Sequence, residues 1–171
     1  MIRSRAETLA LIQRAARGAG LPPGHAEDVA RAAVTALAAD PSCATGIAAA
    51  LTAPAGPVAC QDDGSTLHIP TTRVVWAGPM IRDALDAGAL RIVAGQVDCP
   101  ALLAAMLPGA TVEDAGSGIL VRPAGTPAPV TRGPVDIAPA VWAAFEALAA
   151  RTLVPDTDLS RRAGAGASDA D

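Results

Sequence analysis

The strongest constraint on the fold lies in residues 6–40, which contain two helical patterns separated by a short connection rich in glycine and proline. The apolar residues of the first pattern recur at the spacing of one helix face: Leu9, Ile12, Ala16 and Ala19. Gly18 and Gly20 can provide the left-handed C-cap of this helix. Pro22 and Pro23 can open the next helix, because its first turn does not need the proline N–H. The short connection predicts that the two helices pack antiparallel, as a hairpin.

The second helix has an apolar face of its own and is expected to stop at Asp40-Pro41. Its predicted buried residues are Ala26, Val29, Ala33 and Leu37. Alanine supplies much of the 51% hydrophobic content, whereas aromatic residues make up only 2% of the chain. The few large pieces available to the core are therefore Trp76, Trp142 and Phe145, and burying each of them contributes about 2–3 kcal/mol.

The middle of the chain, residues 58–122, alternates short strand and helix patterns. Asp63-Gly64 is a favoured hairpin dipeptide and lies between two short strands. A second hairpin is expected around residues 116–118, and a strand over residues 89–95. A helix is predicted over residues 79–87, and its inward residues are Met80, Ile81, Ala84 and Leu85. Asp98 is expected to cap a further helix that runs to Leu107.

A closing helix is predicted over residues 137–152, with Val141, Trp142, Phe145 and Leu148 facing inward. This order of elements favours an α+β fold with an N-terminal antiparallel helical hairpin, a small mixed α/β core, a C-terminal helix and an ordered Gly/Ala-rich tail. We expect one α+β domain over residues 1–159, with residues 160–171 as a C-terminal arm.

The charge pattern excludes some classes of partner. The net charge is −4, and the 13 basic residues are all arginine and form no basic stripe, so no nucleic-acid partner is expected. The first residues are charged throughout and show no secretory signal pattern. The longest uncharged run, residues 41–61, is broken by glycine and proline short of the roughly 20 residues of a membrane-spanning helix. We therefore expect a cytoplasmic protein without membrane contact.

Cys99 is the sharpest catalytic candidate, because a thiol near a helix N-terminus can have a lowered pKa. The motifs VDCPALL and VDIAPAVW share a helix-start pattern, however, and the second places Ile137 where the first has Cys99. This comparison favours a structural, apolar position for Cys99. His25 and His68 are the two histidines that could act as a base. The three residues remain weak catalytic candidates, and an enzymatic function is the less favoured alternative.

Two acidic pairs are candidate metal ligands. Asp62-Asp63 lies five residues before His68, and a carboxylate–histidine site is conceivable there. Adjacent aspartates are more often turn formers, and Glu113-Asp114 has the same interpretation. The glycine patterns at residues 116–118 and 164–167 match neither a P-loop nor a dinucleotide fingerprint. We expect no metal and no cofactor.

The tail contains chemistry suited to docking. Ser160 can bond backbone amides, and Arg161 and Arg162 can grip a carboxylate or phosphate in bidentate fashion. Gly164 and Gly166 alternate with alanine and let the backbone lie flat against a surface. Together with Arg151 upstream, these are the predicted interaction residues.

Both ends of the chain resemble a known bacterial family, catalogued as domain of unknown function 3726. The resemblance rests on residues 14–21 (RAARGAGL) and on four C-terminal matches: residues 150–152, 154–155, 160–161 and 163–166. It implies that the tail belongs to the folded unit or to its contact surface, and it implies no reaction. Leu153 stands where the family has tyrosine, and Ala170 stands where it has asparagine, so any role of those side chains is missing here.

Three functions are consistent with these patterns. The first is a small accessory or interaction protein that uses the arm for self-association or for docking on a protein partner. The second is an enzyme or binding protein for an anionic small molecule, with Arg151, Arg161 and Arg162 gathered near His25 or His68. The third is a purely structural domain with a loose end.

Overall fold

The computed structural model describes residues 1–53, 58–116, 118–124 and 133–153. Its helices are α1 (Arg5–Gly18), α2 (Pro23–Ala39), the short 3₁₀ helix η1 (Pro41–Cys43), α3 (Ala44–Thr52), α4 (Val74–Asp86), α5 (Pro100–Met106) and α6 (Pro139–Ala150). Its strands are β1 (Ile2–Arg3), β2 (Gln61–Asp62), β3 (Leu67–Ile69), β4 (Ile92–Ala94), β5 (Ala110–Asp114), β6 (Ile119–Pro123) and β7 (Val135–Asp136). The predicted α+β class is confirmed.

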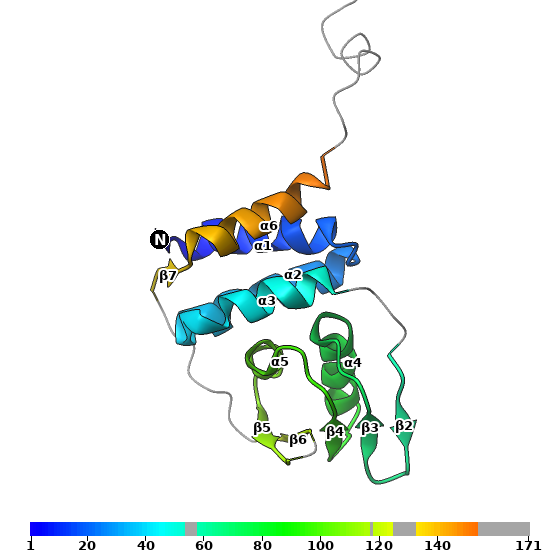
Figure 1. Ribbon diagram of the computed structural model, residues 1–171. Coiled ribbons are helices and arrows are strands. Elements are labelled where there is room, and N and C mark those ends of the chain that lie inside the picture. Colours follow the sequence, from blue (N-terminus) through cyan, green and yellow to red (C-terminus); the bar gives the residue numbers. More distant parts are fainter. Residues whose placement is uncertain (54–57, 117, 125–132, 154–171) are drawn as a thin grey trace, which may run out of the picture.

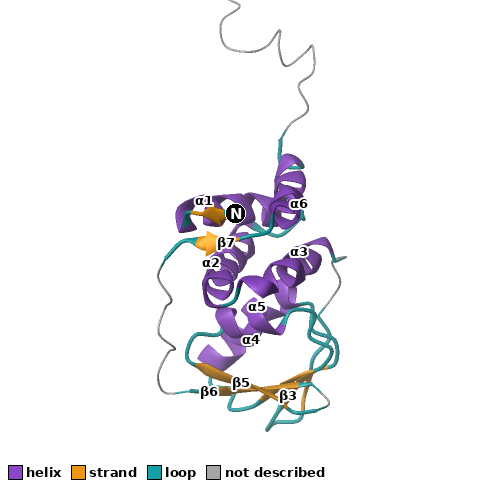
Figure 2. Cartoon of the chain, turned by 60° about the vertical axis from the view of Figure 1, so that its left-hand side comes forward, coloured by secondary structure: helices purple, strands orange, loops and turns teal. Residues whose placement is uncertain are grey.

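The elements stack in layers (Figures 1 and 2). Helices α1 and α6 form one outer layer, and α2 and α3 lie beneath them. Helices α4 and α5 form the next layer and cover one face of a five-stranded sheet, whose strand order is β2-β3-β4-β6-β5. The sheet is the second outer layer, and no helix of the described residues covers its other face.

The predicted hairpin of α1 and α2 is confirmed, and its turn closes as the glycine pattern indicates. Gly20 has φ of 92° and donates its N–H to the Arg17 carbonyl at 2.9 Å. The Leu21 N–H donates to the Ala16 carbonyl at 3.1 Å, which completes a Schellman motif. Pro22 is the N-cap residue of α2, and Pro23 is its first helical residue, as expected.

The buried faces of this hairpin match the sequence pattern unequally. On α2, the predicted residues Ala26, Val29, Ala33 and Leu37 are all fully buried. On α1, Ile12 and Ala16 are buried as expected, but Leu9 and Ala19 are only partly covered. Thr8, Leu11 and Ala15 are buried as well. The buried face of α1 is displaced because this helix packs against both α2 and α6.

Helix α6 runs in the same direction as α1. The strands β1 and β7 directly precede α1 and α6 and pair with each other. The C-terminal end of α1 meets the C-terminal end of α6. A Cβ placed on Gly18 would lie 1.8 Å from the carbonyl oxygen of Leu148. Trp142, Phe145 and Leu148 are buried as expected, and Val141 is partly buried.

The sheet contains one parallel pair, β3 and β4, which α4 connects; its other neighbouring strands are antiparallel. Both predicted hairpins, β2–β3 and β5–β6, are confirmed. Ile69, Ile92 and Val121 are fully buried and face the helices. The alternate residues His68, Val93 and Leu120 are aligned across three strands on the other face.

Two predictions about the start of α4 and of α5 are wrong. Helix α4 begins at Val74 rather than at residue 79, and Pro79 lies inside it. The Asp98 carboxylate accepts the N–H of Val74 at 2.9 Å, so Asp98 caps α4 and not α5. The two loops that follow parallel strands β3 and β4 meet at the same sheet edge, which brings Asp98 to a helix 24 residues earlier.

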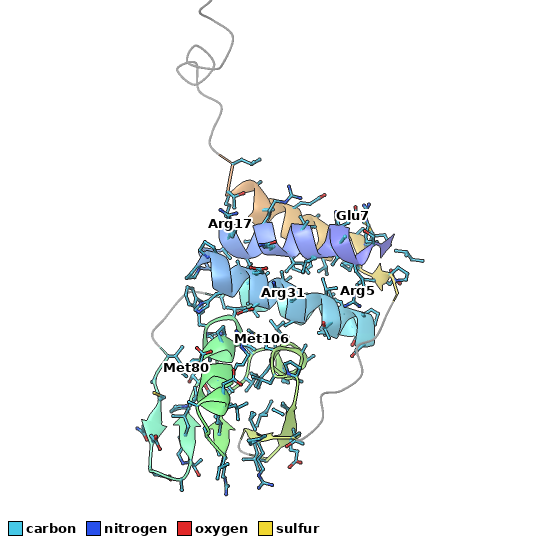
Figure 3. All side chains as sticks on the ribbon, turned by 180° about the vertical axis from the view of Figure 1, so that it is seen from behind. Arg5, Glu7, Arg17, Arg31, Met80 and Met106 are labelled. Atoms are coloured by element: carbon cyan, nitrogen blue, oxygen red, sulfur yellow. The ribbon has the colours of Figure 1, made fainter. Side chains whose placement is uncertain are left out.

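The prediction of the inward face of α4 is also only partly correct, and the contact of α4 with α5 explains why. Gly78 lies against Met106 of α5, and a Cβ at residue 78 would come within 2.6 Å of the methionine sulfur (Figure 3). Ile81 is buried as predicted, whereas Met80, Ala84 and Leu85 are only partly covered. The first turn of α4, which the prediction left out, supplies more of the buried surface through Val74 and Val75.

Candidate functional site

His68 lies beside a shallow depression of about 600 Å³ on the sheet. Asp62 and Asp63 of the β2–β3 turn line the same depression. The Nε2 atom of His68 is 3.4 Å from Oδ2 of Asp63. The structure therefore brings together the carboxylates and the histidine that the sequence suggested as a metal site.

The hydrogen bonds of the two aspartates show that they build the turn. Oδ1 of Asp63 accepts the Ser65 hydroxyl at 2.7 Å, the Ser65 N–H at 2.8 Å and the Thr66 N–H at 2.7 Å. These hydrogen bonds hold the pKa of Asp63 below its usual value, and the two from Ser65 have the largest effect. Asp62 accepts the Gly64 N–H at 2.8 Å. In the described part of the chain, no group of three or more His, Cys, Asp or Glu residues is placed to hold a metal ion.

Cys99 is the N-cap residue of α5 and is buried, with 4% of its surface exposed. Burial raises the pKa of its thiol, which keeps the sulfur protonated and poorly nucleophilic at neutral pH. Ile137, its counterpart in the second helix-start motif, is 1% exposed. Both positions place an apolar side chain into the core, which supports the structural interpretation of Cys99.

His25 lies in the first turns of α2, where its ring meets the edge of Trp76 with centroids 6.2 Å apart. Its Nδ1 atom is buried and has no hydrogen-bond partner in the described structure. Helix α2 and strand β3 belong to different layers, with α4 and α5 between them (Figure 1). No hydrogen bond or ring contact between described residues joins any two of Cys99, His25 and His68.

Arg151 follows α6 as its exposed C-cap residue. Since α6 lies in the outer layer opposite the sheet, the structure places Arg151 far from His68 in the stacking order (Figure 1). The other predicted interaction residues, Ser160, Arg161, Arg162, Gly164 and Gly166, lie outside the described residues.

A second concave surface, of about 540 Å³, lies between α5 and the β5–β6 hairpin; we call it the β5 groove. Its apolar lining residues are Val97, Pro100, Ala104, Val112 and Ile119, and its polar ones include Gln96, Glu113 and Asp114. Sequence reasoning missed this groove because its two walls are separate segments that only the folded sheet brings together.

The wall before α5 is fixed by an unusual backbone. Gln96 has φ of 45°, which is uncommon for a residue with a side chain. Gly95 packs so closely under Pro70 that a Cβ there would lie 2.5 Å from the Pro70 carbonyl oxygen. The Thr71 hydroxyl donates to Oε1 of Gln96 at 3.3 Å. These contacts hold Gln96 and Val97 against the sheet at the mouth of the β5 groove.

Comparison with known proteins gave no match: no family model fits the chain, and no curated protein and no solved structure is similar to it. The resemblance to domain of unknown function 3726 therefore stays a prediction. No described helix has both the length and the apolar character needed to cross a bilayer.

Proposed function

We propose that this chain is a small cytoplasmic accessory or interaction protein, without catalytic activity, that docks on itself or on a protein partner through residues 160–171. We also propose that the chain is related to the bacterial family catalogued as domain of unknown function 3726. The arm would act as the contact element, and the layered α+β body would carry it.

The observation that carries this proposal is the exposure of Leu153, 72% of whose surface is accessible. The buried side chains of α6 are Trp142, Phe145, Leu148 and Ala149, so this helix completes its packing before the arm begins. Arg151 and Leu153 then follow as an exposed cation and an exposed apolar side chain. Arginine is enriched in contact surfaces, and the exposed leucine beside it adds apolar area that a partner can bury.

The chemistry of the arm fits a contact role. Arg161 and Arg162 each offer a planar guanidinium that binds carboxylates in bidentate fashion. The alternating alanine and glycine residues that follow have little bulk, which permits close approach of backbone to backbone.

The alternative, an enzyme or binding protein for an anionic small molecule, receives less support from the geometry. The depression beside His68 is lined by Asp62 and Asp63, whose charges repel an anion. Cys99 has a protonated, buried thiol, and the three catalytic candidates lie on α2, β3 and the start of α5.

Truncation tests the proposed function. A chain that ends at Leu153 should keep the helical circular dichroism of the full chain, because α6 is already complete. The same chain should lose the self-association or the stoichiometric partner that the full chain shows in analytical ultracentrifugation and in affinity capture with purified candidates. Equal association of full and truncated chains would refute the role of the arm.

A further inference from the structure

Among the residues that the structure describes, β5 is an edge strand of the five-stranded sheet, and part of its backbone has no hydrogen-bond partner there. The Ala115 N–H donates to Gly118 at 2.8 Å, and the Ala124 N–H donates to Gly109 at 2.6 Å, so the hydrogen-bonded pairs of this hairpin are known at both ends. Bonded and non-bonded pairs alternate in an antiparallel ladder. Val112 and Asp114 therefore turn their backbone N–H and C=O groups away from β6, toward the outside of the sheet.

This edge adjoins the β5 groove. The side chain of Val112 lies on the helix-covered face of the sheet, opposite Val121, and is partly exposed in the groove. Pro100 and Ala104 of α5 form the facing wall. An exposed strand edge beside a helix and an apolar groove is the arrangement that accepts an added peptide strand, because backbone hydrogen bonds give affinity and the groove receives alternate side chains.

The charge of the edge restricts what can dock there. Glu113 and Asp114 are exposed at this edge, with the Asp114 side chain on the groove side of β5 and the Glu113 side chain on the other face, and no basic residue lines the groove. Asp114 already accepts the Gly116 N–H at 2.8 Å, whereas Glu113 has no ion pair among the described residues. An occupant should therefore be an extended, small-residue segment that brings positive charge.

We propose that the β5 edge and its groove receive the C-terminal arm of a second copy of this chain, with Arg161 and Arg162 against Glu113 and the following Ala-Gly run added to β5 as a further strand. This inference rests on the proposed function, for which it names the receiving surface. In an extended strand, Ala163, Ala165 and Ala167 share one face and can enter the groove, while Gly164 and Gly166 share the other.

The layers favour a second copy over the arm of the same chain. Helix α6 lies in the outer layer opposite the sheet, so an arm folding back on its own β5 would have to pass two helical layers (Figure 1). Fully extended, residues 154–171 span at most about 60 Å. Each copy has one arm and one β5 edge, so two copies can exchange arms in a closed twofold dimer.

Charge exchange in the full chain tests this inference. Glu113→Arg should weaken self-association at least tenfold in sedimentation equilibrium, and so should the double variant Arg161→Glu with Arg162→Glu. Combining all three substitutions should restore association to within about threefold of the unmodified chain. Asp86→Arg, a reversal at an exposed carboxylate at the end of α4, should leave association unchanged.

Val112→Pro supplies a second readout that does not depend on charge. It removes an N–H that points outward, so the ladder to β6 keeps its bonds while the added strand loses one. Circular dichroism checks that the variant folds, and association should again fall at least tenfold. If Val112→Pro does not fold, the charge exchange decides alone.

The other outcomes overturn the inference in distinguishable ways. If truncation at Leu153 abolishes association but the β5 variants do not, the arm docks elsewhere and only the proposed function survives. If the chain is monomeric and Glu113→Arg removes amide protection from residues 163–167, the groove holds the arm of its own chain. If only a foreign protein binds the groove, the second copy is the wrong occupant.

Discussion

The helical layers and the sheet layer are packed in different ways. In the helical layers, α2 buries five alanines in its 17 residues, and α1 approaches α6 so closely that Gly18 touches the backbone of Leu148. In the sheet layer, β2, β3 and β4 are two or three residues long, and aspartate side chains shape the β2–β3 and β5–β6 turns. No helix from the described part of the chain covers one of its faces. Small residues bring helices close and leave no room for added atoms. The sheet layer instead has the face without a described helix, the β5 edge and the two concave surfaces beside His68 and α5.

The largest effect is expected where α1 meets α6. Gly18→Ala places a Cβ 1.8 Å from a backbone oxygen, which cannot rotate away, so the helices must separate. We expect a loss of about 3 kcal/mol in the free energy of unfolding, measured by urea denaturation. The matched control is Gly24→Ala in α2, where nothing lies within 4 Å of the new Cβ. It should be neutral or stabilise by up to about 1 kcal/mol, and equal destabilisation by both variants would contradict the close packing.

A smaller effect is expected at the cap that connects the two loops of the parallel strands. Asp98→Ala removes the acceptor of the Val74 N–H and should cost about 1 kcal/mol. Asp98→Asn keeps an oxygen at the same place and should cost only a fraction of that. Loss of amide-exchange protection should be confined to the first turn of α4. Loss of protection at the start of α5 instead would restore the cap assignment predicted from the sequence.

A weaker contribution is expected from the ion pair that joins α2 to α4. Arg82 donates to Asp28 at 2.6 Å in a partly exposed position. A double-mutant cycle with Arg82→Gln and Asp28→Asn should give a coupling of about 0.5 kcal/mol. The coupling should fall in 1 M salt, where charges are screened within about 3 Å. A salt-independent coupling would point to packing of the arginine stem as its source.

The smallest effect concerns pH. Burial first, and the neighbouring Cys99 thiol second, raise the pKa of Cys43 to about 11. The unfolded thiol titrates near 8.5, so the neutral thiol's contribution to stability is complete at pH 7 and is lost as pH rises toward 11. For this half-buried group we expect a loss of about 0.4 kcal/mol by pH 9. Cys43→Ala should flatten the pH dependence of the unfolding midpoint between pH 8 and 10, and an unchanged slope would exclude Cys43 as its source.

The sequence predictions are accurate where the signal is local and fail where distant segments of the chain meet. The bounds predicted for α1, α2 and α6 agree with the structure to within two residues, because apolar spacing and cap residues are local signals. The helix predicted over residues 79–87 starts at Pro79, whereas Pro79 lies inside α4, which begins at Val74. Asp98 was assigned to the nearest helix in the chain, whereas the parallel strands bring it to another. Of the candidate site, the sequence shows that Asp63 and His68 lie in one hairpin, where a contact is conceivable, and it gives no sign of the β5 groove.

The amino-acid sequence by itself determined the helical hairpin, the two β-hairpins and the buried face of α2, since each depends on neighbours within a few residues. The composition alone determined the acidic, lysine-free charge of the chain. Only the tertiary structure decided that Cys99 is a buried thiol, that Asp98 caps α4, and that Val112 and Asp114 form an open edge beside α5. Those features depend on pairing between distant segments, and the parallel crossover between β3 and β4 fixes that pairing through strand register rather than through any local pattern.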